Sequence, residues 1–207
     1  MADLQWHAER LDWDSLPGQP MDLFGRWHVA AAETEPWHGA AMQLACATKD
    51  GMPSARTVLM RGFGEDGIQF FTNYESRKGQ IFDENPVFAA VFWWPSQVRQ
   101  VRMEGRVARL SRAASDAYFA GRPRGSQLGA WSSPQSQTIG DLASLQQRYA
   151  TIEKAFTGKP VACPPFWGGY LLEPLRVEFW QGGKDRLHDR ALYEKNGDCW
   201  TLARLAP

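Results

Sequence analysis

The sequence predicts a mainly β fold with flanking helices, in which an antiparallel sheet curls strongly or closes into a barrel. Five segments between Met42 and Leu110 are rich in Val, Phe, Thr and Trp, and turn signals such as Asp50-Gly51 and Asp66-Gly67 separate them. Most connections are too short for crossover helices, so neighbouring strands should run antiparallel. The expected strands are 42–48, 54–61, 68–73, 87–94 and 98–110, followed by 170–180, 188–195 and 199–205.

Helical periodicity marks the elements that flank this sheet. Apolar residues recur at helical spacing from Met21 to about residue 32. Shorter helices are expected at 76–84 and from Ser111, a suitable N-cap, to about residue 121. The clearest helix is 138–156, where one apolar stripe is formed by Ile139, Leu142, Leu145, Tyr149, Ile152 and Phe156.

The two ends of the chain differ in organisation. Residues 1–20 are polar and end in prolines, so we expect a loosely held N-terminal arm, docked through Trp6 and Trp13, followed by a single domain over 21–207. Near the other end, Asn196-Gly197 predicts a type I′ hairpin between the last two strands.

One glycine motif imitates a dinucleotide fingerprint. Residues 62–67 fit G-x-G-x-x-G, but the segment that follows is another strand, so no helix N-terminus is present to bind a pyrophosphate. Glu65 and Asp66 would also repel a phosphate. We therefore interpret the motif as a glycine-rich hairpin turn.

Composition limits the possible partners. The 23 basic and 23 acidic residues give no net charge, so nothing draws the whole protein to nucleic acid or to an anionic membrane. The three cysteines are far apart and lack a C-x-x-C pair, which favours reduced thiols over a disulfide framework or zinc site. No apolar run has the character of a signal peptide or reaches membrane-spanning length. We expect a soluble, cytoplasmic protein with no metal.

The histidines give little support to a hydrolase or a metal site. His7, His28 and His38 each follow a tryptophan and show no ligand spacing, so we expect surface or packing roles. No G-x-S-x-G elbow is present, and Asp189 would point to the strand face opposite His188. A Ser-His-Asp mechanism is therefore not indicated.

The segment with the most informative charge pattern lies near residue 190. If it is extended, Arg186, His188 and Arg190 fall at i, i+2 and i+4 and share one strand face. Two guanidinium groups and an imidazole on one surface suit an anion or an electron-rich ring. A charged strand edge that prevents sheet pairing is the alternative, and the spacing alone leaves both open.

Cationic and hydroxyl side chains form two further groups. Arg56 and Arg61 bracket one strand, and Arg77-Lys78 opens a helix after Ser76. Tyr118, Arg122 and Ser126 are spaced by fours, although Pro123 disfavours helical geometry at Arg122. Arginine forks, ammonium groups and hydroxyls together satisfy phosphate oxygens, so the two groups indicate two anionic moieties, whereas each residue alone fits a solvated surface.

Together, these residues resemble the pyridoxine (pyridoxamine) 5′-phosphate oxidase family. The similarity runs in order over about residues 20–207. The matching segments are Arg56–Arg61, Phe71–Lys78, Arg99–Val101, Tyr118–Trp131, Gln135-Ser136, Phe166–Gly169, Glu178–Arg190 and Arg204–Pro207. The resemblance implies an FMN-binding split β-barrel that works as a homodimer, with flavin bound across the subunit interface.

The resemblance also implies a role for each matching residue. It places the FMN phosphate on Arg56, Thr72, Arg77 and Lys78, and the rest of the flavin near Gln100, Gln135, Ser136, Trp180 and Arg190. It adds to the cofactor site Thr57, Val58, Leu59, Met60, Arg61 and Phe71. It assigns the substrate phosphate to Arg61, Tyr118, Arg122 and Ser126. Arg186 and His188 would be the catalytic residues that contact the pyridine ring, with Arg186 covering its side away from flavin.

The implied reaction oxidises the 4′ carbon of pyridoxine or pyridoxamine 5′-phosphate. FMN takes up a hydride, and dioxygen reoxidises the flavin to give hydrogen peroxide and pyridoxal 5′-phosphate. Three positions depart from the family: Arg61 stands where Lys is usual, and Asp3 and Trp6 stand where the family's arm carries Arg and Tyr.

Two other functions remain open from the sequence. A flavin oxidase of the phenazine-biosynthesis type shares the fold and the FMN signature but takes a larger, unphosphorylated tricycle. A noncatalytic carrier of flavin or pyridoxal phosphate could use the same barrel. The trio Tyr118, Arg122 and Ser126 favours a phosphorylated substrate, and retention of Arg186 and His188 favours an enzyme.

Overall fold

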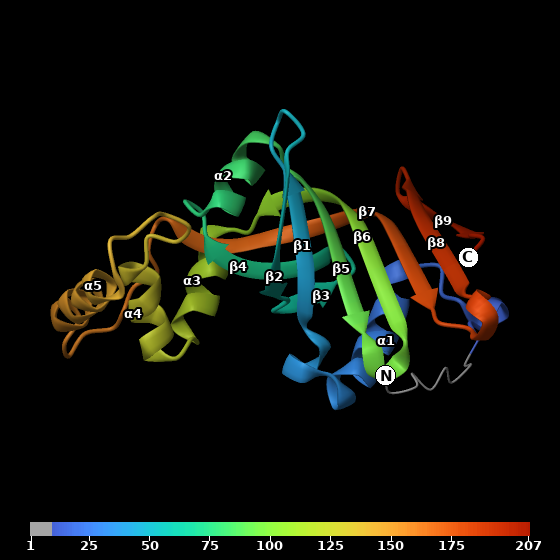
Figure 1. Cartoon of the computed structure of the whole chain (residues 1–207), viewed down its shortest axis with the longest axis horizontal. Helices are drawn as coiled ribbons and strands as arrows, with labels where there is room; N and C mark the ends of the chain where they lie inside the picture. Colours follow the sequence, from blue (N-terminus) through green and yellow to red (C-terminus); the bar gives the residue numbers. More distant parts are fainter. Residues whose placement is uncertain (1–9) are drawn as a thin grey trace.

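Nine antiparallel strands form one curled sheet in the computed structural model, which describes residues 10–207 (Figure 1). The strands are β1 (Ala41–Ala47), β2 (Pro53–Leu59), β3 (Gly62–Gly64), β4 (Gly67–Asn73), β5 (Val87–Trp94), β6 (Arg99–Arg109), β7 (Trp167–Gln181), β8 (Asp189–Asn196) and β9 (Cys199–Arg204). Their order is β2-β1-β5-β6-β7-β4-β3, with β8 paired to β7 and β9 to β8. The antiparallel prediction is confirmed, and only the short β3 is additional.

Strand β7 divides the sheet because its two halves have different partners on one edge. One edge pairs with β6, whereas the other pairs with β4 over Trp167–Leu172 and with β8 over Arg176–Gln181. Pro174, which has no N–H to donate, lies at the division. Opposite it, a Cβ on Gly105 would lie 2.0 Å from the Glu173 carbonyl oxygen, so only glycine fits there. The barrel and the β8–β9 hairpin therefore separate at this point.

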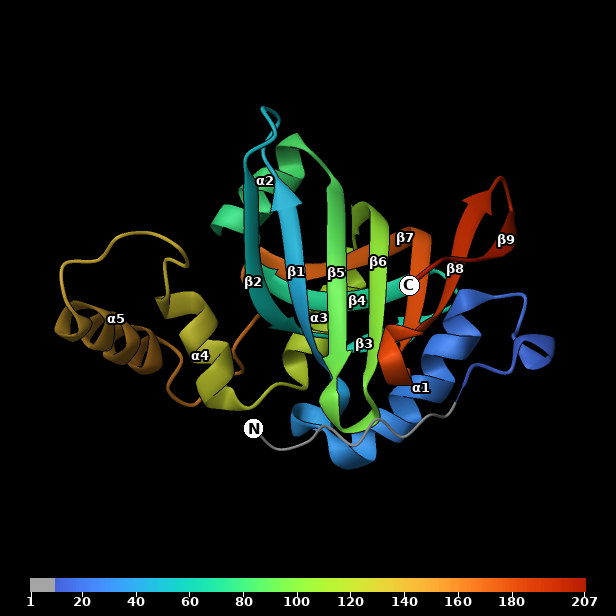
Figure 2. The ribbon, with the colours of Figure 1, turned by 45° about the vertical axis from the view of Figure 1, so that its right-hand side comes forward.

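Five α-helices surround the sheet in the described part of the chain. They are α1 (Pro20–Thr34), α2 (Arg77–Glu84), α3 (Arg112–Ala120), α4 (Arg124–Ser132) and α5 (Leu142–Ala155). Helix α1 covers one end of the barrel. Helices α3, α4 and α5 lie on the side of the sheet that is away from β8 and β9 (Figure 2). Phe24 of α1 is fully buried, with its ring centroid 5.1 Å from that of Phe92. Within residues 10–207, no helix has the length and apolar character needed to cross a membrane.

Helix capping explains where the predicted helices begin. Ser76 and Ser111 accept hydrogen bonds from the third backbone N–H of α2 and α3, as expected for N-caps. Helix α5 begins at Leu142, four residues later than predicted, because the Asp141 side chain caps it by accepting from Ser144 N at 2.7 Å. Its apolar stripe is only partly covered, and Leu142 is 66% exposed.

The two predicted hairpins have different outcomes. Strands β3 and β4 pair with Gly64 opposite Gly67, so the glycine motif is the hairpin turn that we expected. In the β8–β9 hairpin, Asn196 pairs with Cys199, which leaves Gly197 and Asp198 as the loop. Only Gly197 has a positive φ, of 61°. This pattern is typical of a type II′ turn, so the type I′ prediction was wrong by one position.

The described part of the N-terminal segment docks on the β8–β9 hairpin. Arg10 forms a 2.8 Å ion pair with buried Asp189, and the Arg204 guanidinium lies 4.0 Å from the ring centroid of Trp13. Tyr193 donates from its hydroxyl to the Pro17 carbonyl at 2.8 Å. The predicted docking through Trp13 is confirmed. Asp3, Trp6 and His7 lie outside the described residues.

Candidate active site

The first cationic cluster lies at the N-terminus of helix α2. Lys78 is buried, and its ammonium group donates to Thr72 Oγ1 and Ser76 Oγ, both at 3.1 Å, and to Gln135 Oε1 at 3.4 Å. Arg56 lies close to this group on β2, where its guanidinium donates to the carbonyl oxygens of Leu44, at 3.0 Å, and Ser54, at 2.9 Å. These contacts hold two cations in place beside a helix N-terminus.

No acidic side chain of residues 10–207 forms an ion pair with Arg56 or Lys78. Burial lowers the pKa of Lys78 to about 8, and the neighbouring charge of Arg56 acts in the same direction. Uncompensated cations at a helix N-terminus form an anion site. The cluster therefore has the chemistry of a phosphate site.

A second cluster lines an adjacent cavity of about 280 Å³. Arg122 and Ser126 face this cavity together with Gln135, which thus links it to the first cluster. The Nη1 atom of Arg122 is buried and has no hydrogen-bond partner in the described structure. Burial lowers the pKa of Arg122, and the charge of Arg61 lowers it further, so both guanidinium groups are close. A half-buried guanidinium whose buried Nη1 lacks a hydrogen-bond partner, beside a cavity, indicates a place for an anionic ligand.

The Arg122 guanidinium packs against a stack of aromatic rings. The Phe71 and Tyr118 rings are parallel, 6° apart in orientation, with centroids separated by 3.7 Å. Trp167 continues the stack at 5.8 Å from Phe71, and the Arg122 guanidinium lies 4.5 Å from the Trp167 ring centroid. Helices α3 and α4 meet here, with Arg122 in the connection between them, so the predicted single helix face is interrupted at Pro123.

A row of residues in direct register crosses the other end of β7. Gln100 of β6 pairs with Trp180 of β7, which pairs with Arg190 of β8. Trp93 of β5 lies opposite Gln100 and extends the row; its ring centroid is 6.1 Å from that of Trp180. The row presents two indoles, an amide and a guanidinium on one face of the sheet, which suits a planar polar ring.

The predicted strand face of Arg186, His188 and Arg190 was wrong. Strand β8 begins at Asp189, and residues 184–186 form a tight 3₁₀ turn. Arg186 has a φ of 62°, the left-handed region that a non-glycine residue adopts at a cost. His188 nevertheless stays beside the row, since its ring centroid lies 4.5 Å from that of Trp180. Arg190 is the only one of the three within the strand.

The imidazole of His188 is held in one orientation. Its Nδ1 accepts a hydrogen bond from Gly183 N at 3.1 Å, so the neutral ring carries its proton on Nε2. Desolvation lowers the pKa of His188, and the charges of Arg186 and Arg190 lower it further. A neutral imidazole with an Nε2–H donor is therefore favoured near pH 7.

The remaining expected residues lie mostly near the first cluster. Arg77 and Ser136 are exposed, and Ser136 has a φ of 70°. On edge strand β2 and just after it, Thr57 and Arg61 are exposed, Val58 and Leu59 are half-buried, and Met60 is buried. The sequence reasoning missed Trp167 and Trp93. Their roles depend on contacts between distant strands, which residue spacing does not encode.

The two sets of expected ligand-binding residues lie near opposite ends of β7, whose course across the molecule can be followed in Figure 1. Thr72 pairs with Gly168 and Gln100 pairs with Trp180, so the two ends are 12 residues apart on this strand. At about 3.3 Å per residue, this corresponds to roughly 40 Å along the strand.

Comparisons with known proteins identify the family of this chain. The family profile described as pyridoxamine 5′-phosphate oxidase matches residues 34–155, and a second, described as the pyridoxine 5′-phosphate oxidase C-terminal dimerisation region, matches residues 167–207. The chain belongs to the pyridoxamine 5′-phosphate oxidase family.

Individual members of the pyridoxamine 5′-phosphate oxidase family are close in sequence and length. A pyridoxine/pyridoxamine 5′-phosphate oxidase from Rubrobacter xylanophilus is 50% identical, covering 94% of this chain and 89% of the relative. One from Ectopseudomonas mendocina is 49% identical, covering 100% of this chain and 98% of the relative. Among solved structures, PhzG from Burkholderia lata, in complex with tetrahydrophenazine-1-carboxylic acid, has a TM-score of 0.88 and 30% identity, covering 94% of this chain and 95% of that chain. The split-barrel fold is thereby confirmed.

Proposed function

We propose that this protein is an FMN-dependent oxidase that converts pyridoxine or pyridoxamine 5′-phosphate to pyridoxal 5′-phosphate, with O2 as acceptor and H2O2 as product. The observation that carries the choice of substrate is the buried, unpartnered Nη1 of Arg122 in a cavity shared with Ser126. A substrate phosphate would satisfy this guanidinium, with Arg61 and Tyr118 beside it. Arg61 keeps the positive charge of the lysine that is usual in the family and offers a wider fork.

The residues of this chain fit FMN at both ends of β7. Arg56, Lys78 and the N-terminus of α2 suit its phosphate because no carboxylate of the described residues competes for these cations. The row of Gln100, Trp180 and Arg190 suits the isoalloxazine ring, and the Nη2 group of Arg190 has no protein partner in the described structure. Arg77, Gln135 and Ser136 lie where they could add contacts from the phosphate end.

A homodimer would bring the two ends together. Because the phosphate end and the ring end of one chain lie far apart on β7, we assign each complete site to two subunits: one supplies Lys78 and Arg122, the other Trp180 and His188. The match of residues 167–207 to a dimerisation region supports this assignment. The three cysteines are free, which fits a reducing, cytoplasmic location.

The chemistry divides between the cofactor and the protein. When bound, FMN accepts the hydride from the 4′ carbon of the substrate and returns the electrons to O2. Arg122 and Ser126 fix the substrate phosphate, which places the ring for transfer. His188 donates from Nε2 to a ring substituent, and Arg186 stacks its planar cation against the pyridine.

Anaerobic mixing with pyridoxine 5′-phosphate tests this function. We expect bleaching of the flavin band at about 450 nm and its recovery on admission of air, because FMN is reduced by the substrate and reoxidised by O2. Peroxide measured after reoxidation should equal the substrate consumed. A flavin-loaded protein that binds pyridoxal 5′-phosphate without bleaching would instead be a noncatalytic carrier, and our proposal would be wrong.

A phenazine-type flavin oxidase is the second candidate, since the similarity to PhzG covers 94% of this chain. The same experiment separates the two functions when a dihydrophenazine replaces the phosphorylated substrate. Bleaching by the dihydrophenazine alone would favour this candidate. The unsatisfied Nη1 of Arg122 favours the phosphorylated substrate, because an unphosphorylated tricycle would leave this buried N–H group without a hydrogen-bond partner.

The affinity for FMN should fall as the pH rises through about 8. A phosphate dianion binds best to protonated Lys78, whose pKa in the free protein is about 8, so above this pH binding requires uptake of one proton. We expect the logarithm of Kd, from fluorescence titration, to rise by about one per pH unit above pH 8.5. Lys78→Arg keeps its charge at these pH values and should give a flat profile between pH 7 and 9.5. The same slope in this variant would contradict the assignment to Lys78.

A further inference from the structure

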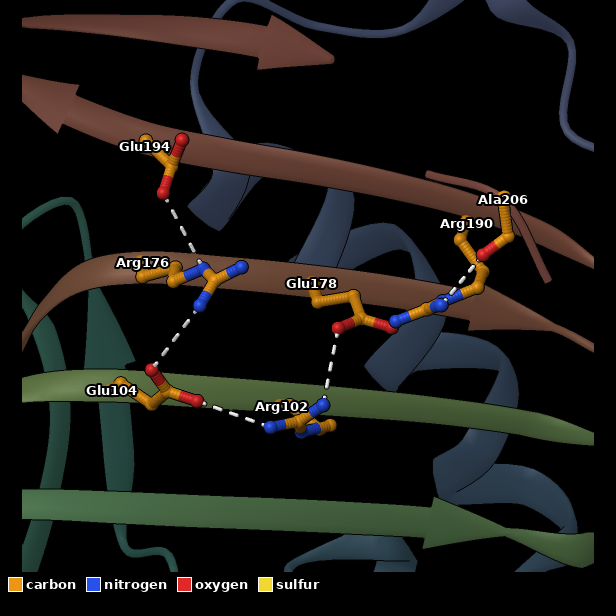
Figure 3. Close-up of polar contacts among 7 residues, drawn as sticks. All are labelled: Arg102, Glu104, Arg176, Glu178, Arg190, Glu194 and Ala206. Atoms are coloured by element: carbon orange, nitrogen blue, oxygen red, sulfur yellow. Dashed lines mark hydrogen bonds and ion pairs between the residues drawn. The ribbon is translucent and has the colours of Figure 1, made fainter. Parts of the chain in front are cut away.

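A chain of alternating charges crosses the outer face of strands β6, β7 and β8 (Figure 3). In order, its members are Glu194, Arg176, Glu104, Arg102, Glu178 and Arg190. The N–O distances shorten from 3.5 and 3.8 Å at the Arg176 end to 2.8 Å between Arg190 Nε and Glu178 Oε1. The tightest contact therefore lies next to the proposed flavin row.

Glu178 is the buried member of this chain of charges. Its side chain is 8% exposed, whereas those of Glu104 and Glu194 are 40% and 57% exposed. Its two carboxylate oxygens are divided between two cations: Oε1 accepts from Arg190, and Oε2 accepts from Arg102 at 3.3 Å. Each carboxylate oxygen of Glu178 therefore accepts a hydrogen bond from an arginine of the same chain of charges.

Strand register places Glu178 on the same face as the proposed flavin row of Gln100, Trp180 and Arg190, and in the row next to it. Alternate residues of a strand share a face, so Glu178 and Trp180 of β7 point to the same side. Trp180 pairs with Gln100 and Arg190, and Glu178 lies in the next row, opposite Arg102. From this position its carboxylate reaches the guanidinium of Arg190 without occupying the row itself.

Arg190 is clamped from two sides. Its Nε donates to Glu178, and its Nη1 donates to the Ala206 carbonyl oxygen at 2.7 Å. These contacts use two of the five N–H donors of a guanidinium, and Nη2 has no hydrogen-bond partner within the described residues. The side chain is thus fixed in rotamer and plane while part of its donor set stays available for a ligand.

Resting on the FMN-binding function proposed above, we propose that Glu178 is a positioning residue for the cofactor, which acts through Arg190. A buried ion pair contributes little net stability compared with an apolar pair, so stability alone does not account for a carboxylate here. Orientation does: a guanidinium held in one plane loses less entropy when it binds the flavin ring. Glu178 itself does not touch the cofactor.

A double-mutant cycle on FMN affinity tests this role. Fluorescence titration of apoprotein gives Kd for the wild type, Glu178→Gln, Arg190→Ala and the double variant. We expect Glu178→Gln to raise Kd about tenfold when Arg190 is present. The change weakens the charged hydrogen bond that orients the Arg190 guanidinium, which is the group proposed to donate to the flavin. In the Arg190→Ala background the same change should alter Kd less than about twofold, because the residue through which it acts is gone.

Two further variants make the result specific. Glu178→Asp keeps the charge but is one methylene too short for the 2.8 Å contact, so its Kd should also rise. This variant replaces Glu178→Gln if circular dichroism shows that Glu178→Gln does not fold. Glu104→Gln removes a carboxylate from the same chain of charges that does not contact Arg190, and its Kd should stay within about twofold of wild type.

The outcomes separate this inference from the proposed function. An equal rise in Kd for the Glu178 variants in both backgrounds would indicate a purely structural role and overturn the inference, as would no rise at all. Wild-type apoprotein that does not bind FMN would overturn the proposed function, and this inference with it.

Discussion

Replacement of Arg122 by methionine should lower kcat/KM for pyridoxine 5′-phosphate by about 10²-fold or more, which is the scale of losing one partner of a buried charged contact. Methionine keeps most of the side-chain volume above Trp167, so the aromatic stack below it should persist. The loss should appear mainly in KM, because the guanidinium binds a part of the substrate that does not react. Steady-state peroxide release over a range of substrate concentrations measures it.

Arg124 provides the matched control for this variant. It lies two residues further on, and its guanidinium donates to the carbonyl oxygens of Lys159 and Phe156, away from the cavity. Arg124→Met should leave kcat/KM within about threefold of wild type. Oxidation of unphosphorylated pyridoxine should be equally slow in Arg122→Met and wild type. If Arg122→Met lowered kcat/KM by the same factor for the phosphorylated and the unphosphorylated substrate, the guanidinium would not be a phosphate ligand.

Mixing two inactive variants should restore activity if each site is built from two subunits. Lys78→Met removes a cation at the phosphate end, and Arg190→Ala removes one at the ring end. In a hybrid dimer one site carries both defects and the other carries neither. After unfolding and refolding of an equal mixture, half of the dimers are hybrids, so we expect about 25% of wild-type activity.

The control for this experiment mixes two variants from the same end. Lys78→Met and Arg56→Met both alter the phosphate end, so every site in their hybrid remains defective and no activity should return. If the Lys78 and Arg190 variants likewise failed to complement each other although size-exclusion chromatography showed dimers, each site would lie within one subunit.

The sequence was a good guide to the sheet because most strands here have a strong local signal. In segments such as β5, which is a run of Val, Phe, Ala and Trp, buried side chains alternate with more exposed ones, and turns that contain glycine separate several of the strands. The C-terminal hairpin was found but placed one position off, because Asn196-Gly197 and Gly197-Asp198 are both acceptable turn pairs.

The site was less accessible to sequence reasoning where it depends on tertiary contacts. The extended reading of residues 186–190 failed because Asp185 and Arg186 adopt positive φ, which alternation of charges does not reveal. The stack beneath Arg122 joins Phe71 to Trp167 across paired strands and was not predicted. The charge pattern singled out Arg56 and Lys78 as phosphate ligands, and the family resemblance added Thr72, whereas the contacts of Lys78 and Thr72 with Gln135 required the fold.

The division of β7 also limits how this protein can change. Its side chains alternate between the core and the outer face, so one inserted residue between Leu172 and Arg176 would turn Trp180 inward and Phe179 outward while leaving the pairing with β4 unchanged. In the two-subunit site proposed above, each subunit would keep its phosphate half-site and lose its ring half-site. The length of this one strand therefore fixes the spacing of the two proposed half-sites in every subunit.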